Sequence, residues 1–258
     1  MTQLVDRTIA ALRSEHDSLA ALVRDLADEQ LAAASGASEW TVAQALSHLG
    51  SGAEIGLAPI ARAAGENVEA EENQTIWARW DASAPRTQAE GFLEHNTRWI
   101  ETVEALTPEQ RSELLVDLGF LPEPVPLLTA LGMRLNEVAN HSWDVRVAFD
   151  EKAGVAPESA TVLLELLSGP MGFLLGFLAK PAEVATPVSV ALPGAGLVID
   201  DAVTVVDHAI ESPSATFNGP AEAFIRLTSG RLKAPHDADV TVEGTLTLDD
   251  LRKVFPGF

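Results

Sequence analysis

The sequence has 258 residues, of which 38 are acidic and 17 basic, so its formal net charge is -21 at pH 7. A chain this negative repels phosphate backbones and anionic lipid headgroups, which argues against nucleic-acid binding and membrane association. Cysteine is absent, so disulfides, thiolate metal sites and a cysteine nucleophile are excluded. The N-terminal residues do not follow the pattern of a signal peptide, and we expect a cytoplasmic protein.

The first half of the sequence has the hydrophobic period of amphipathic helices, with apolar residues mostly three or four apart. Thr41 and Gln44 match a capping box, in which the two side chains satisfy free backbone N–H groups at the start of a helix. Helices are expected over residues 3–33, 41–62, 87–105 and 127–149. Four long amphipathic helices in succession predict a four-helix bundle.

Two shorter features lie between these helices. Residues 65–85 are polar and have few apolar anchors, so we expect a long loop there, with room for a short helix around Trp77 and Trp80. Thr107 followed by Pro108 predicts a further helix start, because proline is well suited to the first position of a helix.

The hydrophobic pattern changes near residue 180. Before this point, a linking helix is expected over about residues 157–178, but Glu165 and Pro170 interrupt it too early for a membrane span of about 20 residues. After it, the period shortens to that of strands. Strands are expected at residues 188–192, 202–206, 215–217 and 239–242, and a helix at 220–229. We therefore expect an α plus α+β protein, with a helix bundle at 1–153 and a small α+β domain at 154–258.

The segment from Arg134 to Asp144 carries ionisable side chains on one face of a predicted helix. At about 100° per residue, the four of them fall within an arc of roughly 80°. Apolar residues border this arc, which suggests that the charges face into the bundle. Burial of charge is costly unless the groups are paired or bind a metal. The four residues are Arg134, Glu137, His141 and Asp144.

Glu137 and His141 are four residues apart, so their side chains converge over one helical turn and can reach one cation at about 2.0–2.2 Å. A third ligand has to come from another helix, and His48, in an apolar stretch, is the best candidate. Two imidazoles and one carboxylate leave a coordination position open, which is typical of catalytic sites. The alternatives are an ordinary glutamate–histidine pair, a core histidine at position 48, and an ion pair between Arg134 and Glu137.

Two stretches of the sequence carry a family resemblance. One runs from Glu39 to Leu49 and contains Trp-Thr-Val and His48; the other is Arg134-x-x-Glu137-x-x-x-His141-x-x-Asp144. They resemble motifs of the mycothiol-dependent maleylpyruvate isomerase family, within the DinB-like (YfiT-like) metal-binding four-helix bundles. The helix expected near residues 221–227, followed by Gly230-Arg231, is similar to that family's C-terminal module, which resembles sterol carrier proteins.

The resemblance implies a divalent metal, usually zinc, held by His48, Glu137 and His141, and the thiol mycothiol as cosubstrate. The composition agrees, because a chain without cysteine needs its thiol from outside. An open metal position lowers the pKa of a bound thiol and so provides a thiolate at neutral pH. The expected activity is thiol-dependent isomerisation or S-transfer on a small electrophile, by a monomer or a homodimer.

Further residues are assigned by position and by the resemblance. The family uses a C-terminal arginine near its substrate, which implies a catalytic role for Arg231, and Arg134 is expected to orient Glu137 or to meet a substrate carboxylate. Trp40 and Trp143 are expected to help bind the cofactor. Asp144 is expected to accept a hydrogen bond from a ligand histidine.

The remaining histidines are expected outside the site. His16 lies beside Glu15 and Asp17, which argues for exposure. The others lack a partner pattern and are expected at the surface; they are His95, His208 and His236.

Other functions fit parts of the same pattern. Two histidines and a carboxylate also form the iron site of non-haem oxygenases, although those sites usually lie in β-sandwiches. A metal-dependent hydrolase would use a metal-bound water at the same place. A non-catalytic protein would use the small domain to bind a lipid or other ligand and the bundle to dimerise, and the glycine-rich apolar residues 169–177 suit an interface.

Overall fold

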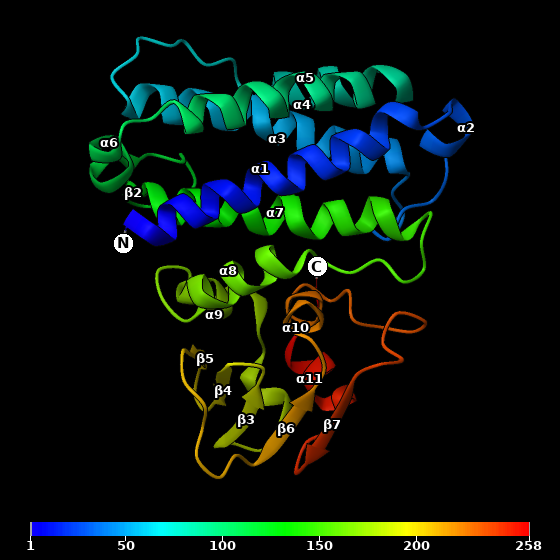
Figure 1. The fold of residues 1–258 in the computed structure, drawn as a ribbon, viewed down its shortest axis with the longest axis vertical. Helices are drawn as coiled ribbons and strands as arrows, with labels where there is room; N and C mark the ends of the chain where they lie inside the picture. The colour runs from blue at the N-terminus through cyan, green and yellow to red at the C-terminus, as the bar shows by residue number, and fades with distance from the viewer. Residues whose placement is uncertain (1, 258) are drawn as a thin grey trace. The chain divides into compact units, whose positions relative to one another are not determined.

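The computed structural model describes residues 2–257 (Figure 1), and these form two compact units, one ending at Ala153 and the other beginning at Gly154. The first unit is helical, and the second contains a five-stranded sheet with helices. The expected fold class, a helix bundle followed by an α+β part, is confirmed. The functional roles assigned to the two parts stay predictions.

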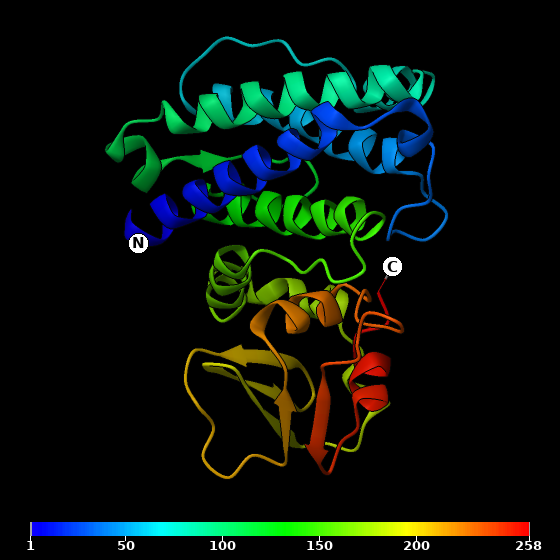
Figure 2. The same cartoon turned by 45° about the vertical axis from the view of Figure 1, so that its right-hand side comes forward.

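Four long helices build the first unit and lie side by side in both views (Figures 1 and 2). In contacts between helices, α3 packs mainly along α5, and α1 along α7. The long helices are α1 (Thr2–Asp25), α3 (Val42–Ala63), α5 (Pro85–Glu104) and α7 (Leu127–Val147). The short elements are α2 (Asp28–Leu31), α4 (Asn73–Asp81), α6 (Pro108–Glu113), β1 (Leu115–Val116) and β2 (Val125–Pro126).

The expected helix over residues 3–33 is wrong in one respect, because the helix is interrupted between Asp25 and Asp28. The side chain of Gln30 accepts a hydrogen bond from the backbone N–H of Ala27 at 2.9 Å, which starts a separate helix there. The capping box at Thr41 is confirmed: its hydroxyl accepts from the backbone N–H of Gln44 at 3.2 Å, and the Gln44 side chain accepts from the N–H of Thr41 at 2.8 Å. This cap fixes the start of α3.

The polar segment between α3 and α5 contains the short helix α4, and this helix anchors a buried tryptophan. Trp80 is buried between α3 and α5, and its Nε1 donates to the carboxylate of Glu54 at 2.7 Å. Two glycines make room for the ring: a Cβ would lie 2.2 Å from a ring carbon at Gly50 and 2.7 Å from one at Gly91. The tryptophan therefore joins α3 to α5 close to His48.

Gly50→Ala is expected to destabilise the protein by about 1–3 kcal/mol, because the added methyl group collides with the Trp80 ring. This loss outweighs the gain of about 1 kcal/mol in helix propensity. Urea unfolding measures it. The control Gly176→Ala lies in a helix with nothing within 4 Å of the new Cβ, and it should not lower the midpoint. Equal midpoints for wild type and Gly50→Ala would contradict the packing described here.

The second unit is built around a sheet of order β5-β4-β3-β6-β7. Its pairs are antiparallel except β3 with β6, which is parallel. The strands are β3 (Val188–Leu192), β4 (Ala195–Ile199), β5 (Val203–Val206), β6 (Ala215–Asn218) and β7 (Thr241–Gly244). The helices are α8 (Pro157–Leu167), η1 (Gly172–Leu174), α9 (Leu175–Leu178), η2 (Pro181–Glu183), α10 (Ala221–Thr228) and α11 (Leu248–Val254).

The linking helix expected over residues 157–178 is wrong, because it ends at Leu167, and Gly169, Pro170 and Gly172 follow. Among residues 2–257, no single helix is long and apolar enough to cross a membrane. The two pieces Pro157–Leu167 and Gly172–Leu178 meet that test only as a pair, and they are bent by 83°.

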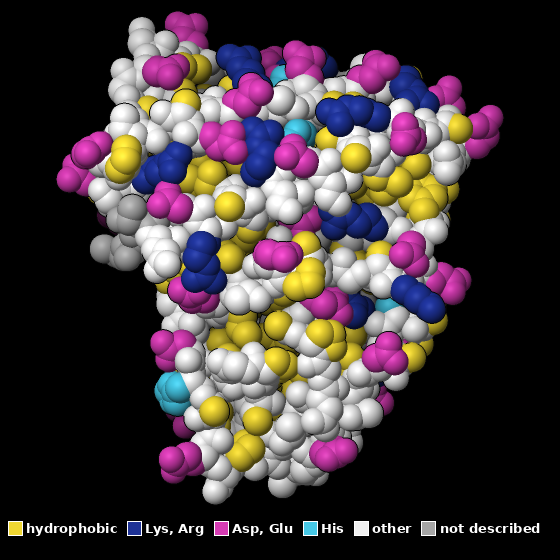
Figure 3. Space-filling model, viewed as in Figure 1, with side chains coloured by type: hydrophobic (Ala, Val, Ile, Leu, Met, Phe, Trp, Pro, Cys, Tyr) yellow, Lys and Arg dark blue, Asp and Glu magenta, His cyan; other side chains and the backbone are white. Residues whose placement is uncertain are grey.

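The acidic excess is visible on the molecular surface. On the face shown in Figure 3, acidic side chains are spread over the surface, and on the helical unit they alternate with lysine and arginine. The negative charge of the chain is therefore distributed over this face and does not form one acidic patch on it.

Candidate metal centre

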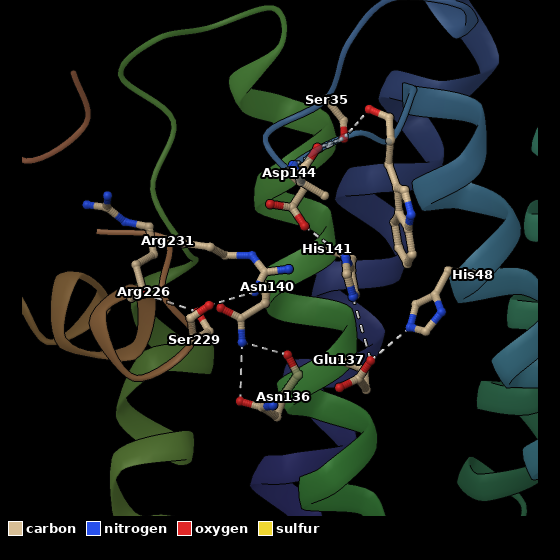
Figure 4. A network of polar contacts seen from close by, with 12 residues as sticks. Ser35, His48, Asn136, Glu137, Asn140, His141, Asp144, Arg226, Ser229 and Arg231 are labelled. Atoms are coloured by element: carbon tan, nitrogen blue, oxygen red, sulfur yellow. Dashed lines mark hydrogen bonds and ion pairs between the residues drawn. The ribbon is translucent and has the colours of Figure 1, made fainter. Parts of the chain in front are cut away.

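Three side chains from two helices meet in the first unit (Figure 4). His48 projects from the second turn of α3, and Glu137 and His141 project from α7 one turn apart. Glu137 Oε2 lies 2.9 Å from His48 Nε2 and 3.6 Å from His141 Nε2. One ligand atom from each residue lies within 4.8 Å of the other two. The structure thus brings together the three residues that the sequence singled out.

The spacing of these atoms suits a divalent metal. Bonds of about 2.0–2.2 Å in a tetrahedral arrangement place donor atoms roughly 3.4 Å apart, and the two observed separations from Glu137 Oε2, 2.9 and 3.6 Å, bracket that value. The side chains of His48 and Glu137 are 42% and 46% exposed, so the cluster is open on one side. Two imidazole nitrogens and a carboxylate oxygen are a donor set that zinc accepts readily.

Asp144 forms a hydrogen bond with the His141 ring on the side away from Glu137. The Nδ1 of His141 donates to Asp144 Oδ2 at 2.8 Å, and the aspartate is fully buried. Because a carboxylate can only accept this bond, the proton stays on Nδ1 and the Nε2 lone pair faces Glu137. Metal-binding histidines commonly have such a partner. The expected hydrogen bond from a histidine to Asp144 is therefore present.

The electrostatics keep Glu137 ionised. Partial burial acts to raise its pKa, but the hydrogen bond from His48 and the nearby side chains of His141, His48 and Arg134 outweigh it and lower the pKa to about 2. Burial lowers the pKa of Arg134 to about 10, and Glu137 opposes that shift. Glu137 is a carboxylate at neutral pH, as a metal ligand needs to be.

Trp40 covers the two histidines. Its ring is stacked on His141, with 5.5 Å between centroids and 23° between planes, and it lies 5.2 Å from the His48 ring. The loop that carries Trp40 is tied to α7, because the backbone N–H of Gly36 donates to the Asp144 carbonyl at 2.7 Å. Trp40 therefore lies beside the cluster, and its expected role in binding a cofactor stays a prediction.

The other expected site residues are described by their contacts within their own units. Trp143 is buried, two residues after His141 on α7, and its Nε1 donates to the carbonyl of Ala153 at 2.7 Å, which is a packing role. Arg134 uses Nη2 to donate to backbone and side-chain oxygens of neighbouring helices. Arg231 follows α10 in the second unit, where it is half-buried and Nη1 donates to the Ser229 carbonyl at 3.3 Å. Catalytic roles for the two arginines and cofactor binding by Trp143 stay predictions.

The expected exposure of His16 is wrong. His16 is buried, and its ring nitrogens lie 2.8 Å from Asn96 Nδ2 and 2.9 Å from Thr97 Oγ1. Its neighbour Glu15 is buried as well, paired with Arg146 at 3.0 Å. Pairing across helices, which the local sequence does not reveal, explains how both residues turn inward.

Among the other histidines, His95 is also more buried than expected. It packs edge-on against Trp80 with 5.5 Å between ring centroids, and its Nε2 lies 3.8 Å from Glu54. His236 is half-buried, whereas His208 is exposed as expected.

Fold and site together define a class of two-part proteins, in which a helix bundle presents two histidines and a glutamate and an α+β unit follows. The profile of the family described as "Mycothiol maleylpyruvate isomerase N-terminal domain" matches residues 12–146, more than half of the chain. The chain therefore belongs to this family. The match includes all three residues of the cluster, and it confirms the resemblance seen in the sequence motifs.

Two solved structures are similar to this chain over both units. They are crystal structures of the mycothiol-dependent maleylpyruvate isomerase and of a histidine-to-alanine mutant of it, with TM-scores of 0.59 and 0.60. Each is 16% identical in sequence and is aligned over 94% of both chains. At this identity the likeness shows the fold. No curated protein matches the sequence.

Proposed function

We propose that this chain is an enzyme that uses mycothiol as cosubstrate and isomerises a small unsaturated electrophile, with a divalent metal held by His48, Glu137 and His141. The observation that carries the proposal is the meeting of three donor atoms within 4.8 Å from α3 and α7. Membership of the maleylpyruvate isomerase family supports the reaction class. S-transfer, in which the sulfur stays attached, is the related reaction open to the same site.

A bound zinc ion would act as a Lewis acid that lowers the pKa of a thiol ligand to near neutrality. The residues of the chain hold and shape the site around it. Asp144 fixes the His141 ring, and three protein ligands leave one position for the incoming thiol. Trp40 provides an apolar wall beside the two imidazoles.

The absence of cysteine makes the cosubstrate the source of sulfur. Addition of the thiolate to a carbon–carbon double bond conjugated to a carbonyl forms a C–S bond, moves the π electrons onto the carbonyl oxygen as an enolate, and leaves a single bond that rotates. Expulsion of the same sulfur breaks the C–S bond and restores the double bond in the other geometry. The thiol is regenerated and no oxidant is needed. Arg231 and Arg134 are proposed to meet carboxylates of the substrate or to orient Glu137, as guanidinium groups commonly do.

The test is turnover of maleylpyruvate, followed by absorbance, in zinc-loaded protein with and without mycothiol. We expect turnover that requires both zinc and thiol, and that is lost in His48→Ala but kept in His208→Ala, which changes an exposed histidine of the second unit. Absence of turnover together with absence of thiol adducts for a panel of unsaturated carboxylates would overturn the proposal. Turnover of an ester or amide with zinc and without thiol would favour the hydrolase.

A further inference from the structure

A line of polar side chains crosses the bundle next to the candidate metal centre. On α1, His16 bonds through its two ring nitrogens to Asn96 and Thr97 of α5, at 2.8 and 2.9 Å. The Oδ1 of Asn96 accepts from Arg134 Nη2 of α7 at 2.7 Å. The same Nη2 donates to the carbonyl of Leu49 on α3, also at 2.7 Å. All four long helices therefore take part.

The donors and acceptors along this line have one consistent arrangement. The amide of Asn96 directs Oδ1 at Arg134, so its Nδ2 donates to Nδ1 of His16. His16 Nε2 then donates to Thr97, whose hydroxyl donates to the carbonyl of Leu93 at 2.6 Å. This requires a neutral His16, in agreement with its pKa, which burial lowers. The orientation of Asn96 is thus fixed from the far side of the bundle.

Arg134 is the residue of this polar line that lies nearest in sequence to the candidate metal ligands of α7. It precedes Glu137 by one turn on α7, and its acceptor Leu49 follows His48 on α3. One guanidinium nitrogen therefore connects the helix that carries one imidazole to the helix that carries the other two ligands. Both of the Nη2 protons are used in these bonds, which leaves neither for a substrate.

The surroundings make room for the guanidinium, and Glu137 acts on it electrostatically without forming an ion pair. A Cβ at Gly52 would lie 2.9 Å from Arg134 Nη1, and Arg134 Cζ lies 5.7 Å from the centroid of the Trp99 ring. Within the described residues, no carboxylate forms an ion pair with Arg134. Buried charges are seldom more stabilising than apolar residues of the same size, so stability alone does not account for an arginine here.

We infer that Arg134 is a positioning residue: it sets the separation between His48 and the pair Glu137–His141, and so the affinity for the metal, with Asn96 and His16 holding it in place. This inference rests on the proposed function, because it takes the cluster to be a metal site. A positioning role predicts that mutation of Arg134 changes the zinc affinity, whereas the expected substrate-binding role predicts that it changes the KM.

The experiment measures the zinc affinity of folded protein by competition with a chromophoric chelator, and the KM for maleylpyruvate in zinc-saturated protein. For Arg134→Met we expect about tenfold weaker zinc binding with KM unchanged within about twofold, and for Arg134→Lys recovery of most of the affinity. Asn96→Ala should shift the zinc affinity in the same direction by less. The double variant should lose less than the sum of the two single losses.

Two controls separate positioning from charge and from general stability. Arg24→Met removes an exposed arginine of α1, and Val103→Ala opens a cavity in the core of α5; both should bind zinc as the wild type does. Unchanged zinc affinity in Arg134→Met and Asn96→Ala, or a rise in KM without a change in zinc affinity, would overturn the positioning role alone. Wild-type protein that binds no zinc would overturn the proposed function, and this inference with it.

Discussion

Glu137→Gln is expected to weaken zinc binding by a factor on the order of 100 to 1,000 and to reduce thiol-dependent turnover to background. A four-ligand zinc site contributes about 10–16 kcal/mol, or roughly 2.5–4 kcal/mol for each ligand, and a loss of that size weakens binding by a factor on the order of 100 to 1,000. Glutamine keeps the shape of the side chain but removes its charge. Chelator competition measures the affinity, and turnover is measured with and without added zinc.

The control for this substitution is Glu90→Gln, which removes an exposed carboxylate from α5. It should bind zinc as tightly as the wild type. Urea unfolding of Glu137→Gln and of the wild type separates a loss of zinc binding from a loss of the fold. Zinc affinity equal to that of the wild type would show that Glu137 is not a ligand.

Asp144→Asn is expected to weaken zinc binding by about 10- to 100-fold, although Asp144 does not face the metal. In the wild type, Asp144 accepts the Nδ1 proton of His141 at 2.8 Å and so keeps Nε2 free. An asparagine amide that donates to Nδ1 favours the opposite tautomer, whose Nε2 carries a proton and cannot bind a metal. Chelator competition measures the affinity, and NMR of the imidazole nitrogens reports the tautomer.

Asp81→Asn, at an exposed position at the end of α4, is the matched control and should leave both measurements unchanged. Asp144→Asn protein with the wild-type tautomer and full zinc affinity would contradict the proposed role of the buried carboxylate. A changed tautomer with unchanged affinity would show that His141 does not bind the metal.

The core of the candidate site could be predicted because its signals are local. Glu137 and His141 are one helical turn apart, and helical geometry alone places them together. His48 was predictable as a histidine in an apolar stretch of helix, but only the packing of α3 against α7 shows that it reaches Glu137. The hydrogen bond between His141 and Asp144 followed from the same helical spacing.

The polar line behind the site could not be predicted in the same way. His16, Asn96 and Arg134 lie on three different helices, and no pattern along the sequence connects them. One signal was present: Asn96 is four residues after Phe92 and three before Trp99, so it occupies the apolar face of α5. A polar residue at such a position needs a buried partner.

Prediction of the fold succeeded where a local motif marks an element. The caps at Thr41 and Thr107 were confirmed. The strand β4 was missed, because it is buried between two neighbours and its run from Ala195 to Ile199 does not alternate. The helix α11 was missed although Thr247 and Asp250 form a capping box. The last expected strand, residues 239–242, is shifted, since β7 is Thr241–Gly244.

The most direct test of the central claim is the zinc content of the purified chain, measured by elemental analysis after dialysis against micromolar zinc. We expect one zinc ion per wild-type chain and none in His141→Ala, while His208→Ala retains one. A wild-type chain without zinc, or equal zinc in the wild type and in His141→Ala, would contradict the proposed metal site.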